Sequence, residues 1–393
     1  MSAANFSVMV RSPDSQARAG ELRTRHGIVP TPVFLPVASK GTVKTLASPD
    51  VKDLGFAMLL SNTYHLHLQP GLEVIEKAGG LHRFMAWDGA ILTDSGGYQV
   101  FSLAPLRKVD EEGVTFRSHI DGSEHRLTPE LAVAYQETLG SNIAMVLDEC
   151  PPFDGSRANI EAATERTARW AERCLKARKR GDQDLFAIVQ GGGFADLRRR
   201  SAEQLATLDF PGYAIGGLSL GEPKTATLAV IEATVPFLPS DKPRYLMGVG
   251  SPEDLVEGVA RGIDIFDCAL PTRVARNGSL FTATGRVNIR NAVFQQTMGP
   301  IDPACDCPTC RSFTAAYLHH LFDAKELLAY RLATIHNLAF INRLMREMRQ
   351  AIVAGNFAAF RAGFLGRYRT TDEQVRLAQK QKWLKKSTSN AGG

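Results

Sequence analysis

The sequence predicts a closed parallel (β/α)₈ barrel, a TIM barrel, with hairpin insertions and a C-terminal subdomain that contains clustered cysteines. Eight short apolar runs rich in aliphatic residues recur along the chain, and helical patterns separate several of them. Near-continuous apolar strands that alternate with helices are typical of a parallel sheet covered by helices, and eight repeats can close a barrel. An open doubly wound sheet is the alternative. No G-x-G-x-x-G follows the first run, so a dinucleotide-binding fold has no support.

The elements of this barrel follow one another in a regular order. The predicted strands are residues 33–39, 58–64, 90–97, 142–150, 185–192, 212–219, 245–251 and 263–269. The predicted helices are residues 129–140, 156–180, 194–208, 224–238 and 252–262. The last helix has Ser251 at its N-cap and Pro252 in its first turn. Glu253 and Asp254 complement the positive end of its dipole.

Three hairpins add to the barrel. Residues 6–39 contain β-hairpin material, residues 114–128 contain Asp121-Gly122 between alternating runs, and residues 279–290 follow the last strand. We therefore expect a catalytic barrel with an N-terminal hairpin over residues 1–290. A zinc-binding subdomain with C-terminal helices packed on the barrel would occupy residues 291–371, and a basic tail residues 372–393.

Composition restricts the class of protein. The 393 residues are 44% hydrophobic and 22% charged, which is ordinary for a globular chain. The net charge of +5 permits an anionic partner without demanding one. No apolar stretch approaches the ~20 residues of a membrane span, and the N-terminus lacks a signal-peptide pattern. We expect a cytoplasmic protein that does not enter membranes.

Acidic and amide side chains follow several strands, at the barrel end where catalytic groups gather. Asp94, Asp148 and Asp267 end three of the apolar runs, and Gln190 ends a fourth. Two carboxylates at one reacting centre suit chemistry at an anomeric carbon, with one as nucleophile and the other as acid and base. The simpler alternative is that Asp267 caps a loop whose arginines are solvated. Asp264 lies on the opposite face of the strand and further from this rim.

The remaining groups at these strand ends suit recognition of a guanine-like ring. A carboxylate such as Asp148 accepts hydrogen bonds from N1–H and the exocyclic amine. O6 accepts from an amide such as Gln190 or from a backbone N–H such as that of Gly217. Tyr98 and Met247 are suitable for the ring faces, although plain core packing would also explain both.

The cysteine cluster predicts a structural zinc site with one ion per chain. Cys305, Cys307 and Cys310 lie within six residues, and three thiolates need one further ligand for tetrahedral zinc. The candidates for the fourth ligand are His319, His320 and His336. A complete Cys₃His set is closed to water and therefore structural.

The motifs together resemble bacterial tRNA-guanine transglycosylases. They are DSGGYQ (94–99), DEC (148–150), GGL (216–218), GVGSPEDL (248–255), FDCALPTR…RNG (266–278) and the C-x-C-x₂-C cluster with IHN (335–337). The likeness covers about residues 6–370, in the same order. It implies a homodimeric barrel that exchanges the wobble guanine, position 34, of tRNAs with a GUN anticodon and a U-G-U core. The incoming base would be a 7-deazaguanine, usually 7-aminomethyl-7-deazaguanine, in queuosine biosynthesis.

The resemblance also implies a role for individual residues. Asp267 would be the nucleophile and Asp94 the general acid and base. The base would bind to Asp94, Ser95, Gly96, Gly97, Tyr98, Asp148, Gln190, Gly217, Leu218 and Met247. RNA would contact Gly248, Val249, Gly250, Ser251, Pro252, Glu253, Asp254, Thr272, Arg273, Val274, Ala275 and Arg276, the last five on a loop. Zinc would be held by Cys305, Cys307, Cys310 and His336.

Some alternatives stay open. Leu220 replaces a smaller residue near the expected position of the 7-substituent, so the preferred incoming base is uncertain between the aminomethyl compound, its nitrile relative and queuine. A two-carboxylate nucleoside or glycoside hydrolase and a non-catalytic zinc-containing RNA-binding protein are the rival functions. Two arginine-rich helical runs, 178–180 and 198–200, are expected to be solvated faces, with RNA contact as the alternative.

Overall fold

The computed structural model describes residues 5–103, 107–370, 374 and 377–378. Its centre is an eight-stranded parallel sheet whose strands include all eight predicted apolar runs. In spatial order the strands are β4 (Val33–Leu35), β14 (Ile265–Asp267), β13 (Arg244–Leu246), β12 (Tyr213–Ile215), β11 (Asp184–Val189), β10 (Ile143–Met145), β6 (Ala90–Asp94) and β5 (Met58–Asn62). A parallel bridge between Val37 and Leu60 joins the two end strands, so the barrel is closed as predicted.

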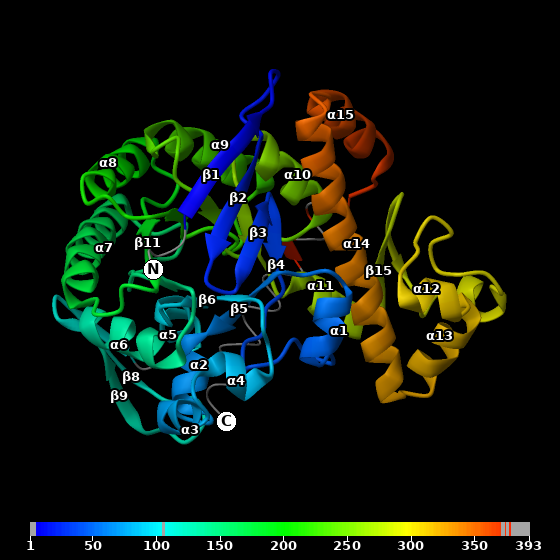
Figure 1. The fold of residues 1–393 in the computed structure, drawn as a ribbon, viewed down its shortest axis with the longest axis horizontal. Coiled ribbons are helices and arrows are strands. Elements are labelled where there is room, and N and C mark those ends of the chain that lie inside the picture. Colours follow the sequence, from blue (N-terminus) through cyan, green and yellow to red (C-terminus); the bar gives the residue numbers. More distant parts are fainter. Residues whose placement is uncertain (1–4, 104–106, 371–373, 375–376, 379–393) are drawn as a thin grey trace.

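Helices surround this sheet (Figure 1). The five predicted helices are present as α6 (Pro129–Leu139), α7 (Arg157–Ala177), α8 (Ala195–Ala206), α9 (Lys224–Thr234, extended by η1, Val235–Phe237) and α10 (Pro252–Ala260). Shorter helices fill the remaining connections: α1 (Ser48–Asp53), α2 (Thr63–Leu68), α3 (Leu72–Lys77), α4 (Leu81–Met85), α5 (Gly97–Leu103) and α11 (Leu270–Arg276). Local signals set the bounds of α6: the Thr128 side chain accepts from the Leu131 N–H, and Gly140 ends the helix with φ +73°.

The helix predictions are wrong at two places. Residues 178–180 follow the end of α7 instead of lying on it. Residues 270–276 form helix α11 instead of a loop, and Ala275 and Thr272 are buried in it. A proline in the first turn starts this helix, and packing against α14 favours it, which no local pattern reveals. Ser251 stands at the N-cap of α10 as predicted, although its hydroxyl donates to Asp254 Oδ2 (2.6 Å) instead of accepting a backbone N–H.

Antiparallel strands decorate both ends of the barrel. Strands β1 (Asn5–Arg11), β2 (Arg18–Thr24) and β3 (Gly27–Thr31) form a sheet that crosses the N-terminal opening (Figure 1). The predicted insertion after the third barrel strand is a three-stranded sheet of β7 (Arg107–Asp110), β8 (Gly113–Arg117) and β9 (Glu124–Leu127). The predicted last hairpin is β15 (Ser279–Thr282) with β16 (Gly285–Asn288).

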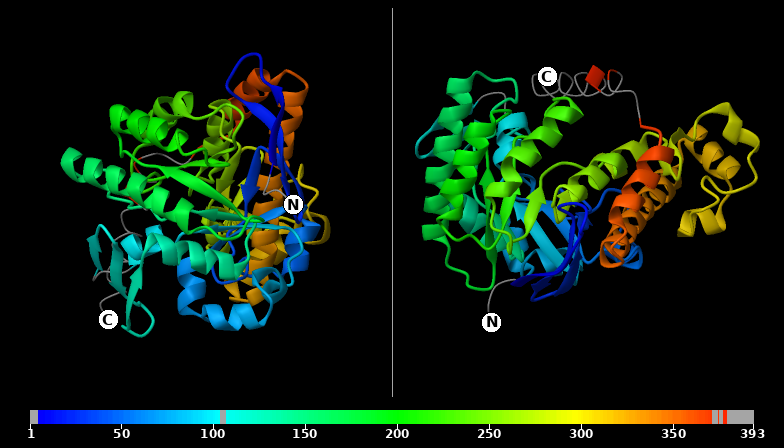
Figure 2. Two further views of the ribbon diagram at one scale, coloured as in Figure 1. Left: turned by 60° about the vertical axis from the view of Figure 1, so that its left-hand side comes forward. Right: turned by 90° about the horizontal axis from the view of Figure 1, so that it is seen from above.

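The C-terminal part begins with η2 (Ala292–Gln296), α12 (Pro308–Ser312) and α13 (Ala315–Asp323), followed by α14 (Leu327–Val353) and α15 (Phe357–Arg367). Helix α14 runs along the barrel, while α12 and α13 lie on its outer side (Figures 1 and 2). A small apolar core there includes the three clustered cysteines. The predicted basic tail, residues 372–393, lies almost entirely outside the described residues. No described helix is both long and apolar enough to cross a membrane.

Candidate active site

The C-terminal ends of the barrel strands surround a cavity of about 490 Å³. Its wall contains many of the residues that the sequence singled out: Asp94, Ser95, Gly96, Tyr98, Asp148, Gly217, Leu218, Met247, Gly248, Asp267 and Arg273. The remaining lining mixes apolar residues such as Val37 and Leu60 with polar residues such as Asn62 and His119. Apolar surface with a few placed polar groups is typical of a ligand pocket. Gly97 and Gln190 do not line this cavity, and neither do the other predicted RNA-binding residues.

Asp94 ends strand β6 and is held by three neutral donors. The Thr63 N–H donates to Oδ1 (2.9 Å), while the amides of Gln99 (2.8 Å) and Asn62 donate to Oδ2. The side chain is 7% exposed. Burial raises the pKa of Asp94 to about 6 against these hydrogen bonds, and the nearby Asp267 adds to the rise. A carboxyl group with such a pKa can both donate and accept a proton near neutral pH.

Asp267 ends strand β14, on the opposite side of the same cavity. The Tyr245 hydroxyl (2.5 Å) and the Gly248 N–H (2.9 Å) both donate to its Oδ1. Among the described residues no donor reaches Oδ2, so one oxygen is oriented and the other is available to a ligand. Burial raises the pKa of this carboxyl, and the hydrogen bond from Tyr245 opposes the rise.

Asp148 follows strand β10 between the other two acids. Burial raises its pKa to about 6, and the Gln190 amide nitrogen, which donates to Oδ2 (2.7 Å), opposes the rise. Gln190 therefore lies behind Asp148 instead of facing the cavity. A Cβ on Gly97 would lie 3.0 Å from Asp148 Oδ1, which explains why a glycine stands there.

Tyr98 and Met247 both line the cavity, as a ring sandwich requires. Tyr98 also borders a second cavity of about 670 Å³, which Leu220 lines together with Phe153 and Arg107. Leu220 is not part of the first cavity's wall. The two cavities share Tyr98, Ser102 and Cys150, so the cavity that Leu220 lines adjoins the one that contains the three acids.

The sequence reading missed the residues that hold the acids. Tyr245, Asn62 and Gln99 donate to the carboxylates, and His65 and His119 also line the cavity. Asn62 and Thr63 carry a detectable signal, because they end the apolar run 58–64 at the same rim. Tyr245 carries none, since it lies in a short buried strand, where an aromatic side chain is expected to pack in the core.

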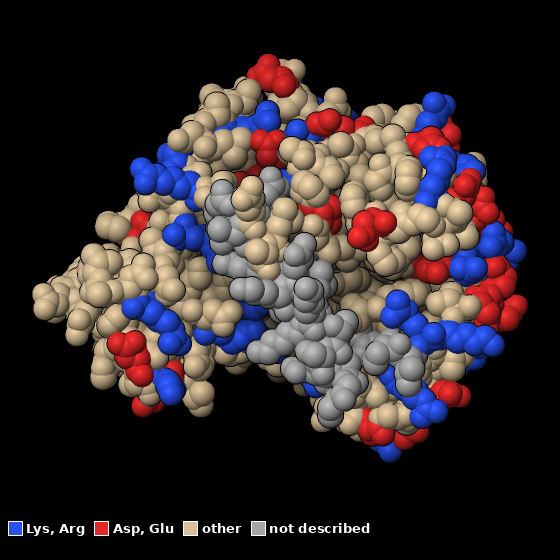
Figure 3. All heavy atoms as spheres, turned by 180° about the vertical axis from the view of Figure 1, so that it is seen from behind, with Lys and Arg blue, Asp and Glu red and all other residues tan. Residues whose placement is uncertain are grey.

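The two predicted RNA-binding segments lie beside the cavity. In the 248–254 segment, Asp254 Oδ1 pairs with Lys224 Nζ (2.9 Å) and Glu253 also pairs with Lys224. In α11, Arg273 lines the cavity and Arg276 is half-buried, whereas Val274 is buried. Burial is the main cause that lowers the pKa of Lys44. The nearby positive charges of Arg276, Lys40 and Arg273 lower it further. Figure 3 shows the face that lies behind the view of Figure 1. Lys and Arg side chains lie there on both sides of its middle.

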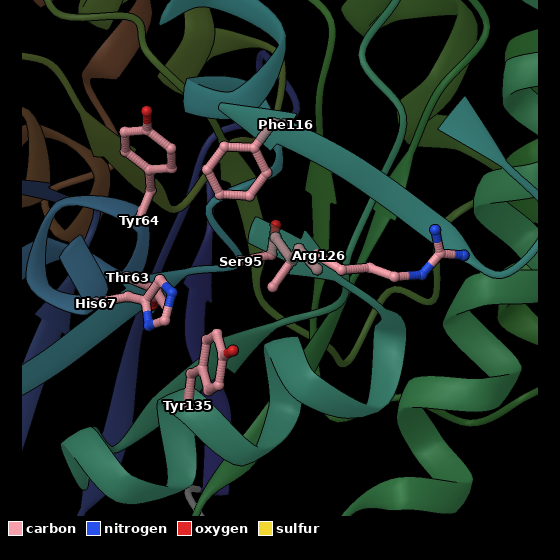
Figure 4. A pocket seen from close by; sticks show the side chains of 8 residues that line it. Thr63, Tyr64, His67, Ser95, Phe116, Arg126 and Tyr135 are labelled. Atoms are coloured by element: carbon pink, nitrogen blue, oxygen red, sulfur yellow. The ribbon is translucent and has the colours of Figure 1, made fainter. Parts of the chain in front are cut away.

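A much smaller cavity lies behind the rim. The rings of Tyr64, Phe116, His67 and Tyr135 surround Ser95 and Thr63 there (Figure 4). Its volume of about 10 Å³ has room for no more than one water molecule. The side chains around it pack next to the strand end that holds Asp94, and the cavity is too small for a base.

A candidate metal-binding group lies far along the chain from these acids. Cys305, Cys307, Cys310 and His336 are all buried, and their ligand atoms lie within 4.8 Å of one another. The sulfurs lie 3.7, 3.7 and 3.2 Å from His336 Nδ1. A tetrahedral zinc ion at ordinary bond lengths requires about 3.5 Å between nitrogen and sulfur. These four residues could therefore hold a metal ion.

The surroundings select His336 over the other candidates. Its Nε2–H donates to the Phe281 carbonyl (2.7 Å), which keeps the proton on Nε2 and leaves Nδ1 free to bind a metal. His319 uses both ring nitrogens elsewhere, at the Ile289 carbonyl (2.8 Å) and Asp323 (3.1 Å). His320 is exposed on α13.

Comparison with known proteins agrees with this geometry. Residues 14–370 match the family model described as Queuine tRNA-ribosyltransferase. The chain is 62% identical over 380 residues to a queuine tRNA-ribosyltransferase of Dehalococcoides mccartyi, covering 97% of both chains. It is 60% identical over 366 residues to that of Pelotomaculum thermopropionicum, covering 93% of this chain and 99% of the other. With Herpetosiphon aurantiacus the identity is 54% over 376 residues and 96% of each chain. The chain therefore belongs to the queuine tRNA-ribosyltransferase family, the tRNA-guanine transglycosylases that its motifs indicated.

Proposed function

We propose that this protein exchanges the wobble guanine of tRNAs with a GUN anticodon for a 7-deazaguanine in queuosine biosynthesis. One observation carries the proposal: the buried carboxyl groups of Asp94, Asp148 and Asp267 line a single cavity of about 490 Å³ in a chain of this family. Three buried acids with raised pKa values are costly to the fold, which is expected where they perform chemistry.

The reaction is a double displacement. Asp267 Oδ2 attacks C1′ of the ribose, the bond from C1′ to N9 breaks, and Asp94 gives its proton to the departing guanine. Asp94 then removes the proton from N9 of the incoming base, whose nitrogen attacks C1′ and displaces Asp267. Two inversions retain the configuration, as in retaining glycosidases with a base in place of water. The pKa of about 6 for Asp94 suits both halves of this cycle.

The base is recognised by groups around Asp148. Its carboxylate accepts the N1–H and the exocyclic amine, and the Gly217 N–H serves O6. Gln190 holds Asp148 through its amide nitrogen, so its role is to orient the acid. Tyr98 and Met247 cover the ring faces, and Ser95, Gly96, Gly97 and Leu218 complete the pocket.

The RNA reaches this pocket through its single-stranded anticodon loop, where bases are unstacked most easily. Arg273 lies in the cavity wall and Arg276 beside it, so α11 reads the bases next to the wobble position in the U-G-U core. Segments 248–254 and 272–276 contact the loop. The active form is a homodimer that works in the cytoplasm, with residues 1–290 as the catalytic unit and residues 291–371 as the metal-binding unit.

The incoming base is 7-aminomethyl-7-deazaguanine. Leu220 lines the second cavity, which adjoins the base cavity, and we infer that its bulk favours a small 7-substituent over the bulky ring of queuine. Competition of the three bases with labelled guanine tests this choice, and a preference for queuine would reverse it.

Incorporation of labelled guanine into tRNA tests the activity itself. A tRNA with a U-G-U core should take up label, whereas the same tRNA with a changed position 33 or 35 should not. A hydrolase would release guanine and leave an abasic site without incorporation. A non-catalytic RNA-binding protein would do neither.

The Cys₃His group holds a structural zinc ion. Its sulfur-to-nitrogen distances fit zinc, and three thiolates prefer it over hard cations. Metal analysis should give about one zinc per chain, as one Cys₃His site implies. The Cys310→Ala variant should lose the zinc and local order around α12. A fully folded, zinc-free native preparation would refute the assignment.

A further inference from the structure

Arg198 is the one residue of the run 198–200 that does not lie on the predicted solvated face of its helix. Arg199 and Arg200 of α8 are exposed and pair with Glu203 and Glu161, as expected of a solvated face. Arg198 is 0% exposed instead. It shares the buried face of α8 with Leu197, Ser201, Ala202 and Leu205, the side that faces the barrel.

The guanidinium group of Arg198 binds three backbone carbonyls at the rim. Nε donates to the Gly192 carbonyl (2.8 Å), and Nη1 donates to those of Val189 (3.0 Å) and Gly216 (2.9 Å). No carboxylate of the described residues forms a direct ion pair with it, and its Nη2 has no hydrogen-bond partner. The buried Glu222 stabilises its charge only through space. A fully buried cation without a directly bonded carboxylate is costly to a fold, so it calls for a further explanation.

The bond to Gly216 determines which way the next N–H points. The peptide unit between Gly216 and Gly217 is planar, so its carbonyl and its N–H point in opposite directions. Because the carbonyl faces Arg198, the Gly217 N–H faces away from it. It lies near the Cys150 thiol in the cavity wall, where it opposes the burial-driven rise of that thiol's pKa. A thiol is a weak acceptor, so a ligand oxygen can displace it easily.

Close packing at this turn leaves no room for side chains. A Cβ on Gly217, at φ +71°, would lie 2.5 Å from Gln190 Oε1 and 3.4 Å from Arg198 Nη2. Gln190 Oε1 is also buried without a partner. The side chains of Arg198 and Gln190 therefore both pack closely against Gly217.

We propose that Arg198 is a positioning residue for O6 of the base: it fixes and polarises the Gly216–Gly217 peptide so that the Gly217 N–H is a strong donor to that oxygen. This inference rests on the proposed guanine exchange. Hydrogen bonds in a chain polarise one another, so a cation at the carbonyl end strengthens the N–H at the other end. The effect grows as guanine leaves, because negative charge then spreads onto O6. Arg198 keeps its charge throughout, since burial lowers its pKa only to about 10.

The test compares guanine with 6-thioguanine as competitors of labelled guanine. Both bases keep the N1–H and exocyclic amine that Asp148 accepts, but sulfur accepts hydrogen bonds poorly. In Arg198→Lys the preference for guanine should fall about tenfold, the size of one charge-assisted hydrogen bond. An unchanged preference in the folded variant would overturn the proposal.

Arg244 provides the matched control. It is also buried, and burial likewise lowers its pKa to about 10, but it begins β13 at the other end of the barrel. Arg244→Lys should lose similar stability and keep the wild-type preference. An equal drop in preference in both variants would show that the effect is a general loss of packing.

A second variant and the unmodified enzyme cover a folding failure. Arg198→Ala leaves a cavity that millimolar guanidinium should fill, which should restore the preference for guanine, whereas ammonium should not. In wild-type protein labelled with carbonyl-¹³C and ¹⁵N glycine, only six Gly–Gly peptides give a coupled signal. The Gly217 signal should move further with guanine than with 6-thioguanine. Equal movement would overturn the O6 contact, while wild-type exchange activity independently reports on the proposed function.

Discussion

Two aspartates three residues apart on one segment have opposite surroundings. Asp264 stands just before β14 at the N-terminal end of the barrel, with both oxygens bonded to Arg18 (2.9 and 2.5 Å) and one to the Arg244 N–H (2.7 Å). Asp267 ends the same strand at the other opening, where only neutral donors reach it and one oxygen stays free. Both side chains are buried, at 0% and 9% exposure.

The difference separates a carboxylate that holds the fold from one placed for reaction. Arg18 compensates the charge of Asp264 and connects the N-terminal sheet to the barrel. Both oxygens of Asp264 are therefore occupied and unavailable to a ligand. Asp267 has no such cation, and only neutral hydrogen bonds oppose the burial that raises its pKa. Burial raises the pKa of Asp264 too, but there the charge of Arg18 opposes the rise. Burial alone does not distinguish the two, whereas the charge of the partner and the free oxygen do.

The largest effect is expected from Asp267→Asn. Removing the nucleophile should reduce guanine exchange at least about 10⁴-fold and abolish the denaturation-resistant RNA adduct. The free energy of unfolding should stay equal or rise, because a buried charge without a cation is removed. Exchange assays, denaturing gels and urea unfolding measure the three quantities. Exchange at the wild-type rate would remove Asp267 from the mechanism.

Asp264→Asn should show the reverse pattern. It leaves Arg18 buried without a full charge partner, so the free energy of unfolding should fall by about 3–5 kcal/mol. Exchange per folded molecule should stay near the wild-type value at a temperature where the variant is folded. The double variant Arg18→Met with Asp264→Asn should regain part of the loss. A stable but inactive Asp264→Asn would contradict the division between the two ends.

The smallest effect concerns pH. Asp148 must be ionised to accept two hydrogen bonds from the base, and burial raises its pKa to about 6. Guanine affinity should therefore fall about tenfold per unit as pH drops below about 6. Direct binding in the Asp94→Asn background avoids the overlapping titration of Asp94, and Asp148→Asn should bind weakly at every pH. Constant affinity between pH 5 and 8 would contradict this role.

The same shift links folding to pH. A carboxyl whose folded pKa lies above its unfolded value of 3.8 binds its proton more tightly in the folded state. Its contribution to stability is therefore present at low pH and is lost as pH rises through about 6. The free energy of unfolding of Asp148→Asn, taken relative to the wild type at the same pH, should thus be higher at pH 7 than at pH 4.

Much of the fold could be read from the chain because its signals are local. The eight apolar runs, Gly140 at the end of α6 and the cysteine spacing each report on neighbouring residues. Eight such runs predict a barrel. The position of the acids at one rim then follows, because the C-terminal ends of all its strands meet there. The sequence could not show Tyr245 as a partner of Asp267, because a tyrosine inside an apolar strand looks like core.

The sequence by itself determined the barrel, the acids at its C-terminal rim and the three clustered thiols, since periodicity and spacing express these directly. The tertiary structure alone decided that residues 270–276 are helical and that Gln190 supports Asp148. It also supplied the contacts that favour His336, which the family resemblance had already implied, as the fourth member of the candidate metal group. It also buried Arg198 while leaving Arg199 and Arg200 in solvent. All four depend on contacts between segments far apart in the chain, and the energy of such contacts appears only when the barrel closes.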